Sequence, residues 1–254
     1  MTLAVAPARE NADIESSSEL YARRFAGPVG QWFLELQAQL TLDCLSGLPP
    51  GATVLDVGGG HAQLAPPLVD AGYQVTVVGS DSSCGRRLAP LISAGRCRFD
   101  VADLLALPYR DQTFDAVVCY RLLAHSIDWR RLVGELCRVA RDRVVVDYPA
   151  RRSLNVASEA LFEIKKSIER GTTRPFALYR RGELARAFAS AGFRLTAERP
   201  QFFLPMALYR LAGSVWLARA AEGLACSIGV TSLLGSPVIA RANRGPDAGD
   251  SRQE

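Results

Sequence analysis

The fold of this 254-residue chain is decided by the stretch Val54-Leu55-Asp56-Val57-Gly58-Gly59-Gly60-His61-Ala62. A short apolar strand runs into an acid and then into three consecutive glycines. Glycine has no Cβ and adopts positive φ readily, so a strand that ends in glycines lets backbone N–H groups approach a ligand closely. The acid ahead of the turn places a carboxylate where a cationic or hydroxyl-bearing group can meet it. The pattern predicts a nucleotide-like ligand at the carboxyl edge of a parallel sheet.

Strand and helix signals alternate along the chain from residue 53 onward. Seven strands are expected, at residues 53–57, 74–78, 97–100, 116–120, 144–148, 193–199 and 236–242. Helices are expected between them, at residues 62–71, 85–94, 129–139, 153–170 and 181–191. Apolar strands separated by helices predict an α/β fold with a doubly wound, mostly parallel, Rossmann-like sheet of seven strands.

The chain is expected to form a single domain over residues 16–242, between flexible tails at residues 1–15 and 243–254. Helices are predicted within residues 16–50, because Ser16-Ser17-Ser18-Glu19 offers a hydroxyl cap and an acid for a first turn, and apolar residues recur at helical spacing over residues 29–45. The apolar insertion at residues 200–235 is predicted to be a helical cap over the site, ahead of the last strand, and to determine the substrate.

Composition and charge exclude several classes of protein. Hydrophobic residues make up 48% of the chain and charged residues 22%, which suits a packed core. The net charge is only +4, and the arginine pairs form no basic stripe with interleaved aromatics, so no nucleic-acid partner is expected. Six widely spaced cysteines without a C-x-x-C pair indicate a reduced, cytoplasmic protein with neither a disulfide framework nor a metal site.

Membrane association is not favoured by the sequence. The first residues lack the basic segment and apolar run of a signal peptide, and no apolar run reaches the roughly 18 residues that span a bilayer. The insertion at residues 200–235 is interrupted by Arg210, Arg219 and Glu222, whereas an interfacial helix needs a cleaner apolar face and a basic polar face. Contact of this insertion with a membrane therefore stays the less favoured alternative.

The glycine turn and the residues after it resemble the class I S-adenosylmethionine-dependent methyltransferases, the broad group that includes small-molecule and quinone methylases. The resemblance covers roughly residues 53–147. In its pattern acid-x-Gly-x-Gly-x-Gly, Ala62 replaces the third glycine. The resemblance implies S-adenosylmethionine as cofactor, held at the turn by Asp56, Gly58, Gly59, Gly60 and His61.

Two further elements of the resemblance follow strands two and three. An acid after strand two holds both ribose hydroxyls in that family, and Asp81, two positions beyond Gly79, is the candidate here. After strand three, the resemblance implies that Asp103 lies near the adenine amino group and that Leu104 offers its backbone N–H near the ring. Asp115 then matches the family's order of residues and is expected to begin strand four as a structural residue.

The segment after strand four faces the sulfonium and the acceptor in that family. Here it reads Tyr120-Arg121-Leu122-Leu123-Ala124-His125. Tyr120 is a candidate for contact with the cationic sulfur through its ring or hydroxyl. His125 is a candidate general base, with closure of the pocket as the structural alternative. Asp147, at the end of strand five, either lines the acceptor site or caps the strand.

The alternative nucleotide ligand, a nicotinamide dinucleotide, requires G-x-G-x-x-G opening a helix. Counted from Gly58 the sixth position is Gln63, and counted from Gly60 the second glycine position holds Ala62, so this fingerprint fails. Tyr21, Arg24 and Phe25 either fold over the cofactor as a lid or simply pack on the sheet.

The expected function is therefore O-, N- or C-methylation of a small, partly apolar molecule, with His125 or Tyr120 facing it. The alternatives are a non-catalytic binding module with the same fold that acts through its hydrophobic cap, and an enzyme that uses the fold for other chemistry, such as decarboxylation. The acceptor and the oligomeric state are not determined by the sequence.

Overall fold

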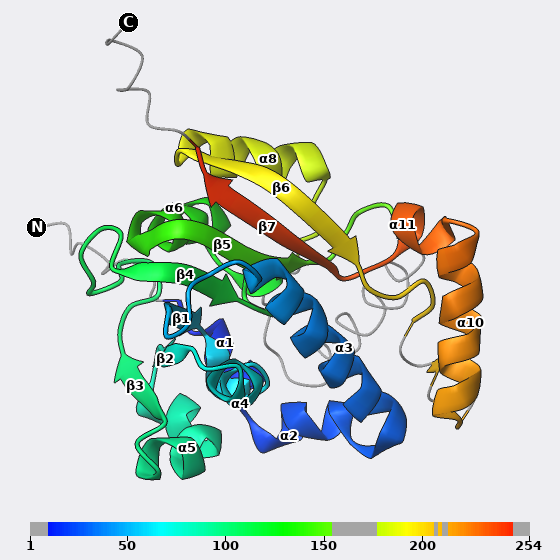
Figure 1. Ribbon diagram of the computed structural model, residues 1–254, viewed down its shortest axis with the longest axis horizontal. Helices are drawn as coiled ribbons and strands as arrows, with labels where there is room; N and C mark the ends of the chain where they lie inside the picture. Colours follow the sequence, from blue (N-terminus) through cyan, green and yellow to red (C-terminus); the bar gives the residue numbers. More distant parts are fainter. Residues whose placement is uncertain (1–9, 154–176, 206–207, 210–212, 246–254) are drawn as a thin grey trace, which may run out of the picture.

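The computed structural model describes residues 10–153, 177–205, 208–209 and 213–245. The helix predicted at residues 153–170 falls almost entirely outside these residues. Figure 1 shows a twisted sheet with helices on both of its faces.

The sheet has seven strands in the order β3-β2-β1-β4-β5-β7-β6. The first five strands are parallel, and β7 runs antiparallel to both of its neighbours. Their bounds are β1 (Thr53–Val57), β2 (Gln74–Gly79), β3 (Cys97–Val101), β4 (Phe114–Cys119), β5 (Ala140–Tyr148), β6 (Phe193–Pro200) and β7 (Val238–Arg244). This sheet confirms the predicted fold class. Its order reverses at β1, which pairs with both β2 and β4, and a ligand crevice is expected at such a switch point.

The described helices fall into three parts of the chain: before β1, between the strands, and in the insertion before β7. The N-terminal set comprises α1 (Ala12–Ser16), α2 (Glu19–Ala22), the 3₁₀ turn η1 (Arg23–Phe25) and α3 (Gly27–Leu45). Between strands lie η2 (Gly59–His61), α4 (Ala65–Asp70), η3 (Ser82–Leu88), α5 (Ala89–Ser93), η4 (Leu123–His125), α6 (Trp129–Val139) and α8 (Arg181–Ser190). The insertion before β7 contains α10 (Val215–Ser227) and α11 (Val230–Leu234).

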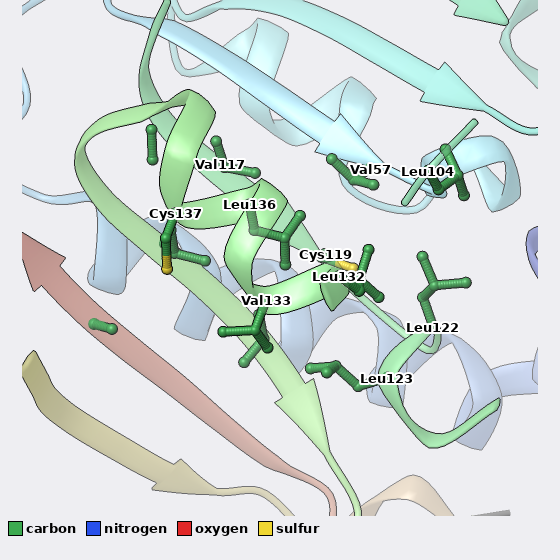
Figure 2. Packing of buried hydrophobic residues seen from close by; sticks show 14 of the residues in the cluster. Val57, Leu104, Val117, Cys119, Leu122, Leu123, Leu132, Val133, Leu136 and Cys137 are labelled. Carbon is green, nitrogen blue, oxygen red and sulfur yellow. The ribbon is translucent and has the colours of Figure 1, made fainter. Parts of the chain in front are cut away.

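Each face of the sheet carries its own apolar cluster. On one face, α6 buries Leu132, Val133, Leu136 and Cys137, which lie on one side of a helix because of their spacing (Figure 2). The same cluster includes Leu122 and Leu123 of the segment after β4. On the other face, α3 and α4 contribute residues to a second cluster with β1, β2 and β4. All six cysteines are free, and five of them are buried.

The insertion before β7 packs against α3 through a third, separate cluster. Phe202 and Tyr209 surround Trp32 and Phe33 of α3. The Phe33 and Phe202 rings are 3.8 Å apart between centroids. In Figure 1, α10 accordingly lies beside α3, at the end of the molecule away from α5. That the insertion covers the site stays a prediction.

Residues 10–15 are not the frayed tail that the sequence predicted. Asn11 precedes α1, and both Glu10 and Asp13 are fully enclosed, with relative exposures of 1% and 0%. The C-terminal tail also begins later than predicted, because β7 continues through Arg244. The helix predicted from residue 62 begins at Ala65, since Ala62 adopts a left-handed φ of 58°. None of the described helices combines the length and apolar character needed to cross a bilayer.

Candidate functional site

The glycine turn lies at the carboxyl end of β1, next to the carboxyl end of β2. Gly58 has φ 74°, and its N–H donates to the Val78 carbonyl of β2. A Cβ at Gly59 would collide with the Asp56 carboxylate, and a Cβ at Gly60 would collide with Ser17 Oγ and the Cys84 carbonyl. The turn therefore requires glycine at successive positions, as a close approach of backbone to other groups demands.

Asp56 is a buried acid whose carboxylate lacks a full set of partners. Its exposure is 2%, and its Oδ2 accepts no hydrogen bond from any described residue. Burial raises its pKa to about 7, and the nearby Arg121 guanidinium offsets part of that rise. A buried acceptor without a donor is costly, so a cationic or donating ligand at this position would be stabilised.

Arg121 lies two residues after β4, and its charge lowers the pKa of the Asp56 carboxyl. Its backbone is left-handed, with φ 60°, which is strained for a residue with a Cβ. Its N–H donates to Asp147 Oδ1 at 2.6 Å, and its guanidinium donates to Gln37 Oε1 at 2.9 Å. The guanidinium also lies over the Phe25 ring, 4.4 Å from the centroid. Burial raises the pKa of Asp147 to about 6, against the effect of Arg121.

His61 sits under the N-terminal helices. Its ring meets the rings of Tyr21 and Phe25 edge-on, at centroid distances of 5.8 and 5.5 Å. Neither ring nitrogen has a hydrogen-bond partner among the described residues. Burial, together with Arg121 and Arg87, lowers its pKa to about 3, so the ring is neutral near pH 7. Tyr21 and Phe25 thus pack against the last residue of η2, and their role as a lid stays a prediction.

The two candidate catalytic residues occupy different environments. Tyr120 is 7% exposed, and its hydroxyl lies 2.6 Å from Thr41 Oγ1 of α3. Burial raises its pKa well above 10, so the hydroxyl is neutral at ordinary pH. His125 ends η4 and is half-buried, with its backbone N–H bonded to the Leu122 carbonyl. Both lie in the segment that follows β4, and their catalytic roles stay predictions.

The adenine-side candidates lie in the turn after β3. Leu104 is fully buried, and Asp103 is half-buried with its carboxylate accepting from the Leu105 N–H at 3.0 Å. This turn is tied to α6. The Glu135 carboxylate accepts from the Leu107 N–H at 2.7 Å, and Arg138 donates to the Leu107 and Tyr109 carbonyls.

Asp81 lies at the start of η3. It is exposed, and its carboxylate accepts from the Ser83 N–H at 2.8 Å. The group found at the end of β2 is instead the Asp13 carboxylate of α1, which accepts from the Ser80 N–H at 2.7 Å and from the Ser80 hydroxyl at 2.5 Å. The ribose role of Asp81 stays a prediction, and Asp13 occupies the neighbouring position.

Asp13, Glu10 and Arg121 were not singled out by the sequence. Asp13 and Glu10 bond to residues 67 and 117 positions away, and nothing in their local pattern signals such contacts. Arg121 lay within the quoted segment after strand four, but one arginine among many carries no signal. Asp56, Gly58 and His61, by contrast, are brought together at the carboxyl edge as their spacing implied.

Comparisons with known proteins point to a methyltransferase domain. Residues 55–146 match the family model described as "Methyltransferase domain". Norajmaline N-methyltransferase of Rauvolfia serpentina is 37% identical over 73 residues, which cover 28% of this chain and 25% of that protein. Demethylmenaquinone methyltransferase of Renibacterium salmoninarum is 32% identical over 108 residues, 41% of this chain and 42% of that protein. The chain thus spans less than half the length of these curated relatives.

A solved structure extends the likeness to nearly the whole fold. Magnesium protoporphyrin IX methyltransferase from Synechocystis PCC 6803, with bound SAH, superposes with a TM-score of 0.61. The superposition covers 92% of this chain and 97% of that chain, at 15% identity. At this identity the likeness shows the fold.

Proposed function

Because this chain belongs to the class I S-adenosylmethionine-dependent methyltransferases, we propose that it transfers a methyl group from S-adenosylmethionine to a small, partly apolar molecule. Methylation at O, N or C is compatible with the site. The names of the relatives, norajmaline N-methyltransferase and demethylmenaquinone methyltransferase, support an acceptor of small size.

The observation that carries the proposal is the unpartnered oxygen of Asp56 beside the glycine turn. The methionine part of S-adenosylmethionine carries an ammonium group. This group is a positively charged hydrogen-bond donor, the kind of partner that the Asp56 Oδ2 atom lacks. Such a partner would lower the pKa of Asp56 and offset the cost of its burial. The residues at this end of the site therefore fit the cofactor.

In the proposed mechanism, the chain acts mainly by positioning its ligands. When bound, S-adenosylmethionine supplies a methyl group on a good, neutral leaving group, so the protein needs no covalent step. Asp56 would hold the cofactor's ammonium, and Gly58 and Gly60 would let the cofactor approach the backbone. Tyr21 and Phe25 exclude water from above the turn. Orientation and exclusion of water supply much of the rate in such reactions.

His125 is the proposed general base for an acceptor that must lose a proton. Tyr120 is assigned no proton transfer, because its pKa is raised and its hydroxyl is held by Thr41. Its proposed role is contact of its ring with the cationic sulfur of the cofactor. Replacing His125 with Ala should reduce turnover without changing the affinity for S-adenosylhomocysteine.

The second candidate function is non-catalytic: a binding module that has the same fold and does not transfer a methyl group. Two observations favour it: Asp13 of α1 bonds to Ser80 beside the expected cofactor site, and α10 and α11 expose large apolar residues. The most exposed of these are Leu233 at 77% and Trp216 at 74%. In this alternative the insertion contacts a partner, and no methyl acceptor exists.

Calorimetric titration with S-adenosylmethionine and S-adenosylhomocysteine tests the proposal. Micromolar binding is expected, about −8 kcal/mol. Binding should be weakened in Asp103→Ala and retained in Asp70→Ala, whose exposed carboxylate pairs with Arg96 at the C-terminal end of α4. If neither ligand binds the unmodified chain, the methyltransferase proposal is wrong and the binding module becomes the better assignment.

A further inference from the structure

The short helix α1 lies across the carboxyl ends of β1 and β2. Asp13 has no exposed surface, and its carboxylate takes both the backbone N–H and the hydroxyl of Ser80, directly after β2. The Cys84 thiol donates to the same carboxylate at 3.3 Å. Three donors on one buried carboxylate make a specific docking contact, since hydrogen bonds to a charged acceptor are stronger than neutral ones.

The residues on both sides of Asp13 lie next to residues of the expected cofactor site. Ala12 is 5% exposed and belongs to the same buried cluster as Leu104 and Leu122. A Cβ built at Gly58 would lie 3.4 Å from the Asp13 Cβ, and one at Gly60 would collide with Ser17 Oγ. Residues 13–17 therefore lie against the glycine turn.

A second acid fixes the start of this segment. Glu10 is 1% exposed, and its Oε2 accepts from the Ile127 N–H at 2.9 Å. Its Oε1 accepts from the N–H groups of Asn11 and Ala12, both at 3.0 Å. The segment is thus anchored at Ser80 after β2 and at Ile127 after η4.

We infer that α1 and the nucleoside half of the cofactor share one site and exclude each other. The inference rests on the proposed function, because that function places ribose and adenine between the glycine turn, the end of β2 and the turn at Asp103. Asp13 offers acceptor oxygens to Ser80, as ribose oxygens would. Cofactor binding therefore breaks the contact between Asp13 and Ser80 and displaces residues 10–17.

This competition sets the apparent affinity of the cofactor. When a segment of the chain occupies the binding site, only the fraction of molecules with an open site can bind. The observed dissociation constant is the intrinsic one divided by that fraction. Removing the Asp13 carboxylate weakens the docked form and leaves the rest of the edge unchanged. Affinity for S-adenosylhomocysteine should then increase.

Calorimetric titration of the full chain with S-adenosylhomocysteine tests this competition. Asp13→Ala should bind about tenfold more tightly than the unmodified chain, the equivalent of about 1.4 kcal/mol. Glu15→Ala is the matched control, because it removes an acid from the same helix that does not bond to Ser80. Asp13→Asn keeps the side-chain volume and provides the comparison if Asp13→Ala fails to fold.

Hydrogen exchange supplies the second readout. Backbone amides of residues 10–17 and of Ser80 should be protected in the unmodified chain, and those of residues 10–17 should exchange faster when S-adenosylhomocysteine is added. Equal affinities for Asp13→Ala, Asp13→Asn and Glu15→Ala, or unchanged protection of residues 10–17 in the bound protein, would overturn the inference alone. Absence of binding in every variant would overturn the cofactor assignment and the inference together.

Discussion

Asp56 is a buried acid whose ionisation opposes folding. Its pKa is raised from 3.8 to about 7 in the folded chain, so between these values the folded state binds more protons than the unfolded state. Stability contributed by the protonated carboxyl is therefore greatest below pH 4 and is lost as the pH rises through 7. Asp147, with its pKa raised to about 6, adds a smaller effect of the same sign.

Asp56→Asn should become progressively more stable than the unmodified chain as the pH rises from 4 to 8. The amide cannot ionise, and each pKa unit corresponds to about 1.4 kcal/mol, so the relative gain across this range is roughly 2 to 4 kcal/mol. Urea unfolding at a series of pH values measures it.

Asp115→Asn is the matched control for this titration. Hydrogen bonds from Thr53 and the charge of Arg141 outweigh burial and lower the pKa of Asp115. Its contribution is present above its unfolded pKa and is lost only as the pH falls through its lower folded value. The difference between Asp115→Asn and the unmodified chain should therefore be constant from pH 4 to 8. A parallel response of both variants would contradict the assignment of buried charge to Asp56.

Residue-level prediction from the sequence succeeded where a contact is local. The glycines and Asp56 lie within five positions, so their pattern indicates their proximity. It failed where contacts join distant parts of the chain. Nothing near Asp13 indicates that its carboxylate would reach Ser80, and nothing near Arg121 indicates its left-handed backbone.

Among the secondary-structure elements, α6 has a second role besides covering the sheet. Its Arg138 donates to the carbonyls of Leu107 and Tyr109 and pairs with Asp111 at 2.9 Å. Glu135, one turn before it, accepts from the Leu107 N–H. The helix therefore holds the loop that follows Asp103 and Leu104.

Arg138→Met should release this loop. Methionine keeps most of the stem but removes the donors to two loop carbonyls, so the unfolding free energy should fall by about 2 kcal/mol. Hydrogen exchange at Leu107 should become faster. Arg130→Met, on the same helix, removes a cation that lies over the Trp129 ring and should leave Leu107 unchanged. Equal exchange at Leu107 in both variants would show that α6 does not hold the loop.

The order of elements was predictable because hydrophobic patterns are local. Residues 53–57 and 129–139 form a strand and a helix with the predicted bounds. The boundaries that moved have local physical causes. Ala62 is left-handed and delays the start of α4, and residues 82–88 form a 3₁₀ turn before α5. Helix α1 escaped prediction because its five residues are stabilised by tertiary contacts of Asp13 rather than by its own pattern.

At the scale of the whole molecule, the described residues form three apolar clusters rather than one. Two of them lie on the faces of the sheet, and the third joins α3 to the insertion through Trp32, Phe33, Phe202 and Tyr209. A single buried acid, Glu222, holds the insertion together by accepting from the Phe203 N–H, the Tyr209 hydroxyl and the Thr231 hydroxyl. Separate clusters permit separate local opening.

Phe202→Ala should increase local opening of the insertion while the sheet stays folded. Phe202 is 1% exposed, and removal of a buried phenylalanine costs about 3 to 5 kcal/mol. Amide exchange should accelerate in α10 and α11 and stay slow in β1 and β4. Phe188→Ala is the counterpart in the sheet cluster, where the same change should destabilise α8 and its strands. Uniform acceleration in Phe202→Ala would mean that the clusters unfold as one unit.

The anchoring of α1 also has a consequence for how the protein is made. Glu10 bonds to Ile127, 117 residues later, and ribosomes add about 5 to 20 residues per second. The N-terminal segment therefore waits roughly 6 to 23 s on the growing chain before its second anchor has even been synthesised. During translation, the paired strands β1 and β2 and the Ser80 partner of Asp13 are therefore available before Glu10 can be anchored.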